Sequence, residues 1–378
     1  MKRYSLVNLR QCYLEQKQEI DRAIQSVVEQ SAFFLGEELK KFEVEFSRFL
    51  KAKYVLGLGS GTAALKLALQ VLDIGPGDEV ITTPSTFIAD AEAIVAVGAK
   101  PVFVDIKPNS LNIDPEKIES AITKKTKAII VVHLYGVACQ IDKIIKIAKR
   151  HQLKVIEDCA QAQGTRYKGR VLGTFGEIGC FSFYPTKVLG AFGDGGAVMT
   201  NNKSYYEKIL LLRNHGRKKN KGAFKIIGDT LCLDNVQAGV LRVKLKKISG
   251  VIQRRFRLAK RYNLLLKNYE WVKPMYLPEN CMPSLYVYTV KILNRDKIRR
   301  YLESKGIETG VYYLKPLHLQ QSLRFLGYKK GDFPVAEKVS QEVLSLPFHQ
   351  GLTVKDLDYI VGVLKEGVER FELKSIMQ

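Results

Sequence analysis

Short apolar runs alternate with helix-length stretches between Lys53 and Asn201, and this alternation limits the possible folds more than any other feature. Strands that alternate with helices are typical of a mostly parallel sheet covered by helices on both faces. The expected strands are Tyr54–Leu58, Glu79–Thr83, Pro101–Asp105, Ala128–His133, Lys154–Asp158, Gly179–Phe183 and Ala197–Thr200. The expected helices between them are Thr62–Leu72, Thr86–Val97, Pro115–Ile122 and Ile141–His151. We therefore predict an α/β fold with a seven-stranded, mostly parallel sheet.

The rest of the chain has a different pattern, which indicates a second, smaller α/β domain. The sequence is helical and basic from Asn201 to about Leu266. A strand at Tyr286–Ile292, a helix at Lys297–Lys305 and a final helix near Lys355–Arg370 are then expected. We place the domain boundary close to Gly250, which gives a large domain of residues 1–250 and a small domain of residues 251–378. The helical N-terminal residues 1–30 are expected to pack on either domain.

The chain of 378 residues is strongly basic, with a formal net charge of +22. Basic runs such as Arg217–Lys221 and Arg254–Arg257 allow one interpretation, a nucleic-acid-binding regulator. The other interpretation is lysine-rich helix faces in water, whose positive field draws in a phosphate-bearing substrate. No helix-turn-helix, zinc-finger or RNA-binding motif accompanies the charge, so we favour the second interpretation and expect no nucleic-acid partner.

Targeting signals and cysteine usage indicate a cytoplasmic protein. The first residues lack the apolar core of a signal peptide, and no stretch is long enough to cross a membrane. The cysteines are scattered without CxxC pairs, at Cys12, Cys139, Cys159, Cys180, Cys232 and Cys281. We therefore expect reduced thiols, no metal site and no membrane partner.

A lysine and an aspartate follow two of the expected core strands. Lys187 comes after the apolar segment that ends at Phe183 and just before a glycine-rich loop. Asp158 ends the strand Lys154–Asp158. Ligands of parallel sheets gather at the carboxyl ends of the strands. An amine and a carboxylate there suit pyridoxal phosphate, whose aldehyde forms a Schiff base with lysine and whose ring nitrogen is kept protonated by a carboxylate.

Other residues near the expected strand ends fit the same cofactor less specifically. The turn Gly57–Leu65 enters a helix, and the free amides at a helix N-terminus bind phosphate. Phe87 either stacks on the pyridine ring or packs in the core, and the sequence alone leaves both readings open. Ser60 and His133 also lie at or just past strand ends.

The motifs, in their order along the chain, resemble those of a known enzyme family. They are Phe34-Leu35-Gly36, Phe42-Glu43, Ser60–Leu65, Gly75–Val80, Thr83–Ala89, His133–Gly136, Glu157–Gln161, Phe181–Lys187, Gly195–Val198, Arg213–Gly216, Gln237-Ala238 and Pro316–His318. Along nearly its whole length the chain resembles the DegT/DnrJ/StrS family of pyridoxal-phosphate-dependent sugar aminotransferases.

The resemblance implies an aspartate-aminotransferase-like fold (fold type I), with the large domain binding the cofactor, and a homodimer with shared active sites. It also implies an amino-acid donor, by family habit L-glutamate, and a nucleotide-linked keto-sugar acceptor, for amino-sugar, polysaccharide or lipopolysaccharide biosynthesis. The residue roles that it implies are the Schiff-base amine for Lys187, the pyridinium partner for Asp158, ring stacking for Phe87 and contact with the phenolic oxygen for Gln161. Ser182, Gly61, Thr62 and Ala63 would hold the phosphate, and Tyr313, His318 and His215 would contact the sugar substrate.

The chain departs from the family pattern in one motif. Members usually carry Gly-x-Asn-x-Arg before the Gln-Ala helix, and that asparagine reaches the partner's cofactor phosphate. Here Thr230 replaces the asparagine and Cys232 replaces the arginine. A threonine hydroxyl still donates a hydrogen bond but has a shorter reach, so this cross-subunit contact is an open question.

The loop after Lys187 bears on which sugar carbon is aminated. Leu189–Asp194 and the helix segment Leu241–Leu245 are similar to family members that act on 3-keto sugars. The resemblance therefore favours amination at C3, with a 4-keto-sugar aminotransferase as the alternative. A sugar dehydratase of the same family is disfavoured, since those enzymes typically carry histidine at the position of Lys187.

Overall fold

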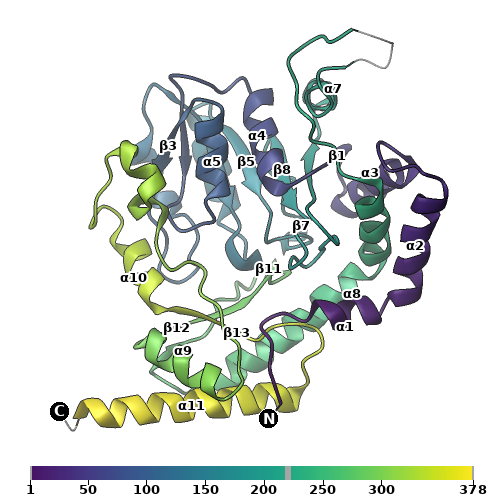
Figure 1. Cartoon of the computed structure of the whole chain (residues 1–378). Coiled ribbons are helices and arrows are strands. Elements are labelled where there is room, and N and C mark those ends of the chain that lie inside the picture. The colour runs from purple at the N-terminus through teal and green to yellow at the C-terminus, as the bar shows by residue number, and fades with distance from the viewer. Residues whose placement is uncertain (1, 218–222, 377–378) are drawn as a thin grey trace.

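A computed structural model describes residues 2–217 and 223–376 of the chain. Its centre is a seven-stranded sheet with the order β1-β9-β8-β5-β4-β2-β3 (Figure 1). Its strands are β1 (Tyr54–Leu58), β2 (Glu79–Thr82), β3 (Lys100–Phe103), β4 (Thr126–Val132), β5 (Lys154–Asp158), β8 (Ile178–Ser182) and β9 (Gly196–Thr200). Strand β9 pairs antiparallel with β1 and β8, and the other pairs are parallel. The predicted fold class is confirmed, and the expected strand ends are met to within two residues.

Helices cover both faces of this sheet, because successive side chains of a strand point to opposite sides. On one face Ile156 and Cys180 pack with α4 (Gly61–Val71), α5 (Ala89–Ala96) and α7 (Lys203–Leu212). On the other face the neighbouring residues Val155 and Phe181 pack with α3 (Glu37–Leu50), α6 (Ile141–Arg150) and α8 (Asn235–Leu266). Three of the four expected inter-strand helices, α4, α5 and α6, are therefore confirmed.

The helix expected at Pro115–Ile122 is wrong in type. The segment forms two short 3-10 turns, η1 (Pro115–Lys117) and η2 (Glu119–Ala121). Each of its backbone hydrogen bonds spans three residues, as in the bonds from Ile118 to Pro115 and from Ile122 to Glu119. Asp114 and Pro115 favour a helical start. Ile118 packs in the core and the backbone is extended again at Ile122, so the segment forms tight turns instead of an α-helix.

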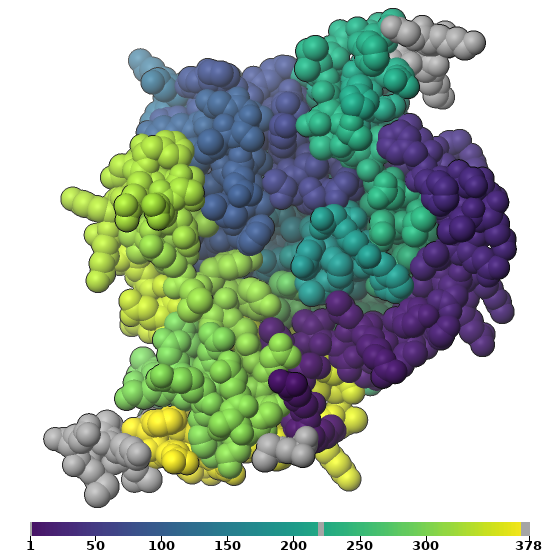
Figure 2. Space-filling view, viewed as in Figure 1, coloured from purple at the N-terminus to yellow at the C-terminus, as the bar shows by residue number. Residues whose placement is uncertain are grey.

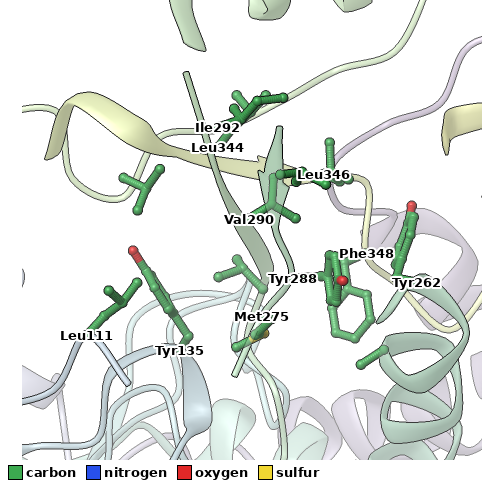
Figure 3. Close-up of a cluster of buried hydrophobic side chains, with 14 of the residues drawn as sticks. Leu111, Tyr135, Tyr262, Met275, Tyr288, Val290, Ile292, Leu344, Leu346 and Phe348 are labelled. Carbon is green, nitrogen blue, oxygen red and sulfur yellow. The ribbon is translucent and has the colours of Figure 1, made fainter. Parts of the chain in front are cut away.

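The C-terminal part forms a second, smaller layer around a three-stranded antiparallel sheet. The sheet has the order β10 (Val272–Lys273), β12 (Tyr288–Ile292) and β13 (Val343–Leu346). It packs with α9 (Arg295–Ser304), α10 (Pro334–Glu342), α11 (Val354–Ile376) and the second half of α8. Figure 3 shows Tyr262 from α8 beside Tyr288, and their ring centroids lie 4.5 Å apart. The expected strand and both expected helices of this part are confirmed.

The proposed domain boundary at Gly250 falls inside the continuous helix α8, which has 32 residues. Leu241 and Ile252 on this helix pack with the large sheet, whereas Tyr262 and Leu266 pack with the small one. The core of the small part also includes Leu111 and Tyr135 from the large part, as the close-up shows (Figure 3). The division of the chain at residue 250 stays a prediction. It would mark the point at which α8 changes from packing on the large sheet to packing on the small one, with no linker between the two parts.

The N-terminal segment contacts both parts. Tyr4 pairs with Ile307, and the dark purple first residues lie against the green and yellow C-terminal surface (Figure 2). Helix α2 (Lys17–Glu29) packs against α8, and α1 (Leu9–Leu14) leads into it. The remaining elements are β6 (Arg166–Tyr167), β7 (Arg170–Val171), β11 (Cys281–Met282), η3 (Leu134–Gly136), η4 (Leu317–Leu319) and η5 (Gln321–Leu326).

Three further expectations concern the cysteines, membrane-spanning helices and the basic run at Arg217. All six cysteines are free thiols. Within residues 2–217 and 223–376, no helix is both long enough and apolar enough to cross a membrane. The basic run that starts at Arg217 lies mostly outside the described residues, because residues 218–222 are not among them.

Candidate active site

A cavity of about 440 Å³ opens where β5 and β8 end and α4 begins. It brings together most of the residues that the sequence analysis singled out. The lining residues are Ser60, Gly61, Thr62, Leu65, Thr86, Phe87, Ala89, Asp158, Ala160, Gln161, Ser182, Tyr184, Lys187, Asp194, Gly195, Tyr286, Tyr312 and Tyr313. Its position at the carboxyl ends of parallel strands is where α/β sheets bind ligands.

The N-terminus of α4 forms one wall of this cavity. The Ser60 hydroxyl accepts a hydrogen bond of 3.0 Å from the Ala63 amide and so caps the helix. The amides of the first two helical residues, Gly61 and Thr62, have no partner within the helix and lie at the positive end of its dipole. A Cβ on Gly61 would lie 2.8 Å from the Ser182 Cβ, so only glycine lets the helix approach β8 this closely. This wall forms an anion cradle from the amides of Gly61 and Thr62. The Ala63 amide already donates to Ser60.

Asp158 lies on the floor of the cavity, at the end of β5, and is almost fully buried. Its carboxylate accepts a hydrogen bond of 2.8 Å from the Ala160 amide. Burial raises the pKa of Asp158, while the Ala160 amide and the charge of Lys187 act in the opposite direction. A carboxylate in this setting suits a cationic ligand atom, because such a partner offsets the cost of burying the charge.

The neighbouring residue, Glu157, points to the other side of β5 and fixes the strand. Its carboxylate accepts hydrogen bonds from the Gly176 amide at 2.8 Å and lies 3.2 Å from His133 Nε2. Since His133 Nδ1 accepts from the Cys139 amide, Nε2 carries the proton and donates to Glu157. The ligand atoms of His133, Glu157 and Cys159 lie close enough for a metal ion, but internal hydrogen bonds already occupy the histidine and the carboxylate.

Lys187 faces Asp158 from the loop after β8. Burial lowers the pKa of Lys187 to about 8, and the charge of Asp158 partly opposes this shift. Its ammonium nitrogen lies 4.2 Å from the ring centroid of Tyr286, a cation–π contact. The Tyr286 hydroxyl is held 3.0 Å from the Thr186 hydroxyl, which keeps the ring beside the amine. Near pH 7 about a tenth of such an amine is uncharged and nucleophilic, far more than for an ordinary lysine.

Phe87, Gln161 and Tyr313 line the opposite side. Phe87 is 55% exposed and lines the cavity, so core packing, the other reading left open by the sequence, is excluded for its ring. Gln161 is held at both ends, because its oxygen accepts from the Tyr135 amide at 2.7 Å and its nitrogen donates to the Tyr313 hydroxyl at 3.1 Å. The second N–H of Gln161 remains available for a ligand oxygen.

The structure does not bring two of the expected substrate residues to this cavity. His318 on η4 is buried, lies 3.0 Å from Glu337 and packs edge-on against Phe333. His215 is exposed, and its Nε2 lies 2.7 Å from the Thr230 hydroxyl. Their roles toward a substrate stay predictions, as do the roles of the residues that do line the cavity.

The structure adds residues that the sequence analysis did not assign to a site. Tyr286 and Tyr312 come from the C-terminal part, and Asp194 comes from the glycine-rich loop after Lys187. The place of Asp194 in that loop was a usable signal, since the loop lies next to the lysine. The tyrosines had none, because only the packing of the small layer on the large one brings them to Lys187.

These residues fit a planar, phosphate-bearing cofactor with an aldehyde. The anion cradle at α4, the carboxylate of Asp158 and the amine of Lys187 surround one cavity, and the exposed ring of Phe87 is available for stacking. An α/β fold with a buried lysine and aspartate at the carboxyl edge of its sheet is what enzymes of the fold type I class require.

Comparison with known proteins gives the family. Residues 14–365 match the DegT/DnrJ/EryC1/StrS aminotransferase family. The chain is 42% identical to a "Pleiotropic regulatory protein" of Geobacillus stearothermophilus, over 97% of this chain and 99% of that protein. It is 37% identical to the "dTDP-3-amino-3,4,6-trideoxy-alpha-D-glucose transaminase" of Streptomyces venezuelae, over 98% and 97%.

Solved structures agree with these matches. The crystal structure of S. venezuelae DesV in complex with a ketimine intermediate superimposes with a TM-score of 0.94 and 37% identity, over 97% of this chain and 98% of that chain. NtdA from Bacillus subtilis with bound cofactor PMP gives a TM-score of 0.90 and 31% identity, over 98% and 86%. The chain belongs to the DegT/DnrJ/EryC1/StrS aminotransferase family, and the expected family, fold and enzyme class are confirmed.

The lowered pKa of Lys187 leads to a stability prediction for the cofactor-free protein. The folded state disfavours the ammonium form, and this penalty is complete below pH about 8 and disappears as the pH rises through 10.5. Lys187→Met should therefore raise the free energy of unfolding near neutral pH by up to about 3 kcal/mol, at roughly 1.4 kcal/mol per pKa unit. Urea unfolding at a series of pH values measures this difference, which should shrink above pH about 8.

The matched control is Lys338→Met, because the Lys338 side chain is 77% exposed on α10. This variant should differ little from the wild type, and the difference should not change with pH. A Lys187→Met effect that is equally independent of pH would contradict the burial of the charged amine.

Proposed function

We propose that the protein is a pyridoxal-phosphate-dependent aminotransferase that moves an amino group from an amino acid to a nucleotide-linked 3-keto sugar. The observation that carries the proposal is the pair formed by Lys187 and Asp158 in one cavity with the anion cradle of α4. The pKa of Lys187, about 8, suits an amine that must be neutral to react and charged to hold a proton. L-Glutamate is the proposed donor, by the habit of the family.

Each part of the cofactor has a proposed partner in the cavity. Asp158 would face the ring nitrogen and Phe87 would stack on the ring. Gln161 would donate its free N–H to the phenolic oxygen. The phosphate would lie at the N-terminus of α4, against the Gly61 and Thr62 amides and the Ser182 hydroxyl. The Ala63 amide, expected in this set, donates to Ser60 instead, so we propose that it stabilises the cradle indirectly.

The chain's own groups then have separate tasks. When bound, the cofactor supplies an aldehyde for the amine and a ring that accepts electrons. Lys187 binds the aldehyde between reactions and, once released, accepts a proton from one carbon and returns it to another. Asp158 keeps the proton on the ring nitrogen, because its negative charge favours the cationic ring. Tyr286 restrains the Lys187 amine through the contact with its ring.

The proposed acceptor follows from the relatives and from the loop beside Lys187. The S. venezuelae relative is a transaminase named for a dTDP-linked 3-amino sugar. The loop Leu189–Asp194 brings Asp194 to the edge of the cavity, where its carboxylate can accept hydrogen bonds from sugar hydroxyls. The net charge of +22 would attract the nucleotide's phosphates. A 4-keto sugar is the alternative acceptor, and amino-sugar or polysaccharide biosynthesis in the cytoplasm is the proposed setting.

We further propose that the enzyme works as a homodimer with shared active sites. The segment around Thr230 carries exposed apolar side chains, with Phe224 at 61% and Ile227 at 94% exposure. Such side chains are unfavourable in water and suit a surface that a second copy covers. Thr230 hydrogen-bonds to His215, whose neighbour Asn214 pairs with Thr230, so both residues would lie at the interface.

Asp158→Asn should lower kcat by roughly 10²- to 10³-fold while changing the affinity for pyridoxal phosphate by less than about tenfold. An amide cannot compensate a cationic ring nitrogen, whereas the phosphate cradle is untouched. Steady-state kinetics and a cofactor titration measure the two effects. Asp105→Asn, at a buried aspartate outside the cavity, is the control and should keep its kcat. Turnover of Asp158→Asn near the wild-type rate would place the ring partner elsewhere.

The choice of carbon is tested by competition. When the enzyme is offered glutamate with both a 3-keto and a 4-keto deoxysugar nucleotide, it should aminate the 3-keto compound, because the loop Leu189–Asp194 is similar to that of 3-keto enzymes. Product NMR identifies the aminated carbon. Amination at C4 alone would overturn the proposal and leave the 4-keto alternative.

Thr230→Asn tests the proposed interface. The longer asparagine side chain restores the usual family residue, so the dimer should persist and the affinity for pyridoxal phosphate should stay equal or increase. Sedimentation velocity and a cofactor titration give the two values. A monomeric wild-type protein would overturn the proposed homodimer. A clear loss of cofactor affinity in the variant would show that this segment runs differently from its course in the family.

A further inference from the structure

A second buried carboxyl group lies directly beside Asp158. Asp90 is in the first turn of α5, its side chain is fully buried, and its carboxyl group lies close enough to that of Asp158 for the two groups to interact directly. Two buried carboxylates this close repel each other, so in such pairs one carboxyl group generally keeps its proton.

The hydrogen bonds of Asp90 show where that proton must be. Its Oδ2 accepts a hydrogen bond of 2.8 Å from the Thr86 hydroxyl. Its Oδ1 is buried and receives no N–H or O–H donor from any described residue. Asp158 in turn accepts from the Ala160 amide and is also an acceptor toward Asp90. A proton on Asp90 Oδ1 converts this contact between two acceptors into a hydrogen bond.

The surrounding charges favour ionisation of Asp158 over ionisation of Asp90. The charge of Lys187 lowers the pKa of Asp158, whereas burial and the charge of Asp158 raise the pKa of Asp90 well above its usual range. The buried Cys180 thiol faces both groups, and Cys159 and Tyr313 face Asp158. The hydrogen bond from Thr86 and the N-terminus of α5 favour a charged Asp90, but both effects are smaller than that of full burial beside a carboxylate.

We infer that Asp90 is a positioning residue: a neutral carboxylic acid that donates its proton to Asp158 and so keeps Asp158 ionised and correctly oriented. This inference rests on the proposed function, in which Asp158 faces the ring nitrogen of the cofactor. Asp90 itself does not line the cavity and touches no reacting atom. The pair carries one negative charge, which is the charge that a cationic ring nitrogen needs opposite it.

Infrared spectroscopy of the full chain detects the proton directly. The carbonyl stretch of a protonated carboxylic acid should be present in the wild type near neutral pH and lost in Asp90→Asn. Asp105→Asn is the matched control, because Asp105 is also buried but accepts hydrogen bonds from the Val335 and Ala336 amides. This control should keep the signal. An Asp90→Asn spectrum identical to that of the wild type would overturn the inference.

The kinetics and the NMR spectrum of the enzyme loaded with pyridoxal phosphate give the second readout. Asparagine still donates to Asp158 and accepts from Thr86, whereas leucine of similar size does neither. Asp90→Asn should therefore keep kcat within about threefold and leave the nitrogen-15 NMR signal of ring-labelled pyridoxal phosphate in its protonated position. Asp90→Leu should move that signal toward the unprotonated position and lower kcat at least about tenfold, with the KM for the sugar within about twofold.

The outcomes separate this inference from the proposed function. If no pyridoxal phosphate binds but the infrared signal depends on Asp90, the shared proton is supported and the proposed function fails. If the cofactor binds and Asp90→Leu leaves its ring-nitrogen signal unchanged, the inference fails while the proposed function stands. Equal losses in Asp90→Asn and Asp90→Leu would also overturn it, because they would indicate a charged Asp90 and not a neutral donor.

Discussion

The parallel pairing of β5 with β8 is the constraint on which the site depends. The register places Asp158 opposite Cys180, so both strands end at the same edge of the sheet. The chain that leaves β8 therefore passes beside Asp158 before it reaches Lys187. The same edge receives the N-terminus of α4, which can approach because Gly61 has no side chain. One sheet edge thus supplies an amine, a carboxylate and an anion cradle.

The interior charges of this edge depend on one another. Burial favours the neutral form of the Lys187 amine and of the Asp158 carboxyl group alike, and each charge partly offsets that effect on the other. On the other side of β5, Glu157 hydrogen-bonds to His133 and to the Gly176 amide, and these bonds hold the end of the strand. Lys244 shows that a lowered lysine pKa is not sufficient for this chemistry. Its pKa is also about 8, but it donates to the Gly190 carbonyl and lies outside this cavity.

The sequence predicted the parts of the structure that depend on local pattern. Strand periodicity gave the large sheet to within two residues, and strand ends gave Lys187 and Asp158, because a parallel sheet brings such ends together. Contacts between segments that lie far apart in the sequence have no such local pattern. Tyr286 reaches Lys187 only when the small layer packs on the large one, and Asp90 reads as an ordinary acid in a helix. The 3-10 turns at Pro115–Ala121 and the buried position of His318 likewise follow from packing and not from pattern.

Borohydride reduction of the protein loaded with pyridoxal phosphate tests the central claim most directly. Reduction fixes the cofactor to the amine that holds it, and mass spectrometry of the digested protein identifies that lysine. A pyridoxyl group is expected on Lys187 alone, with no labelled peptide from Lys187→Ala. A label on Lys244, whose pKa is also about 8, or a label that persists in Lys187→Ala, would contradict the role of Lys187.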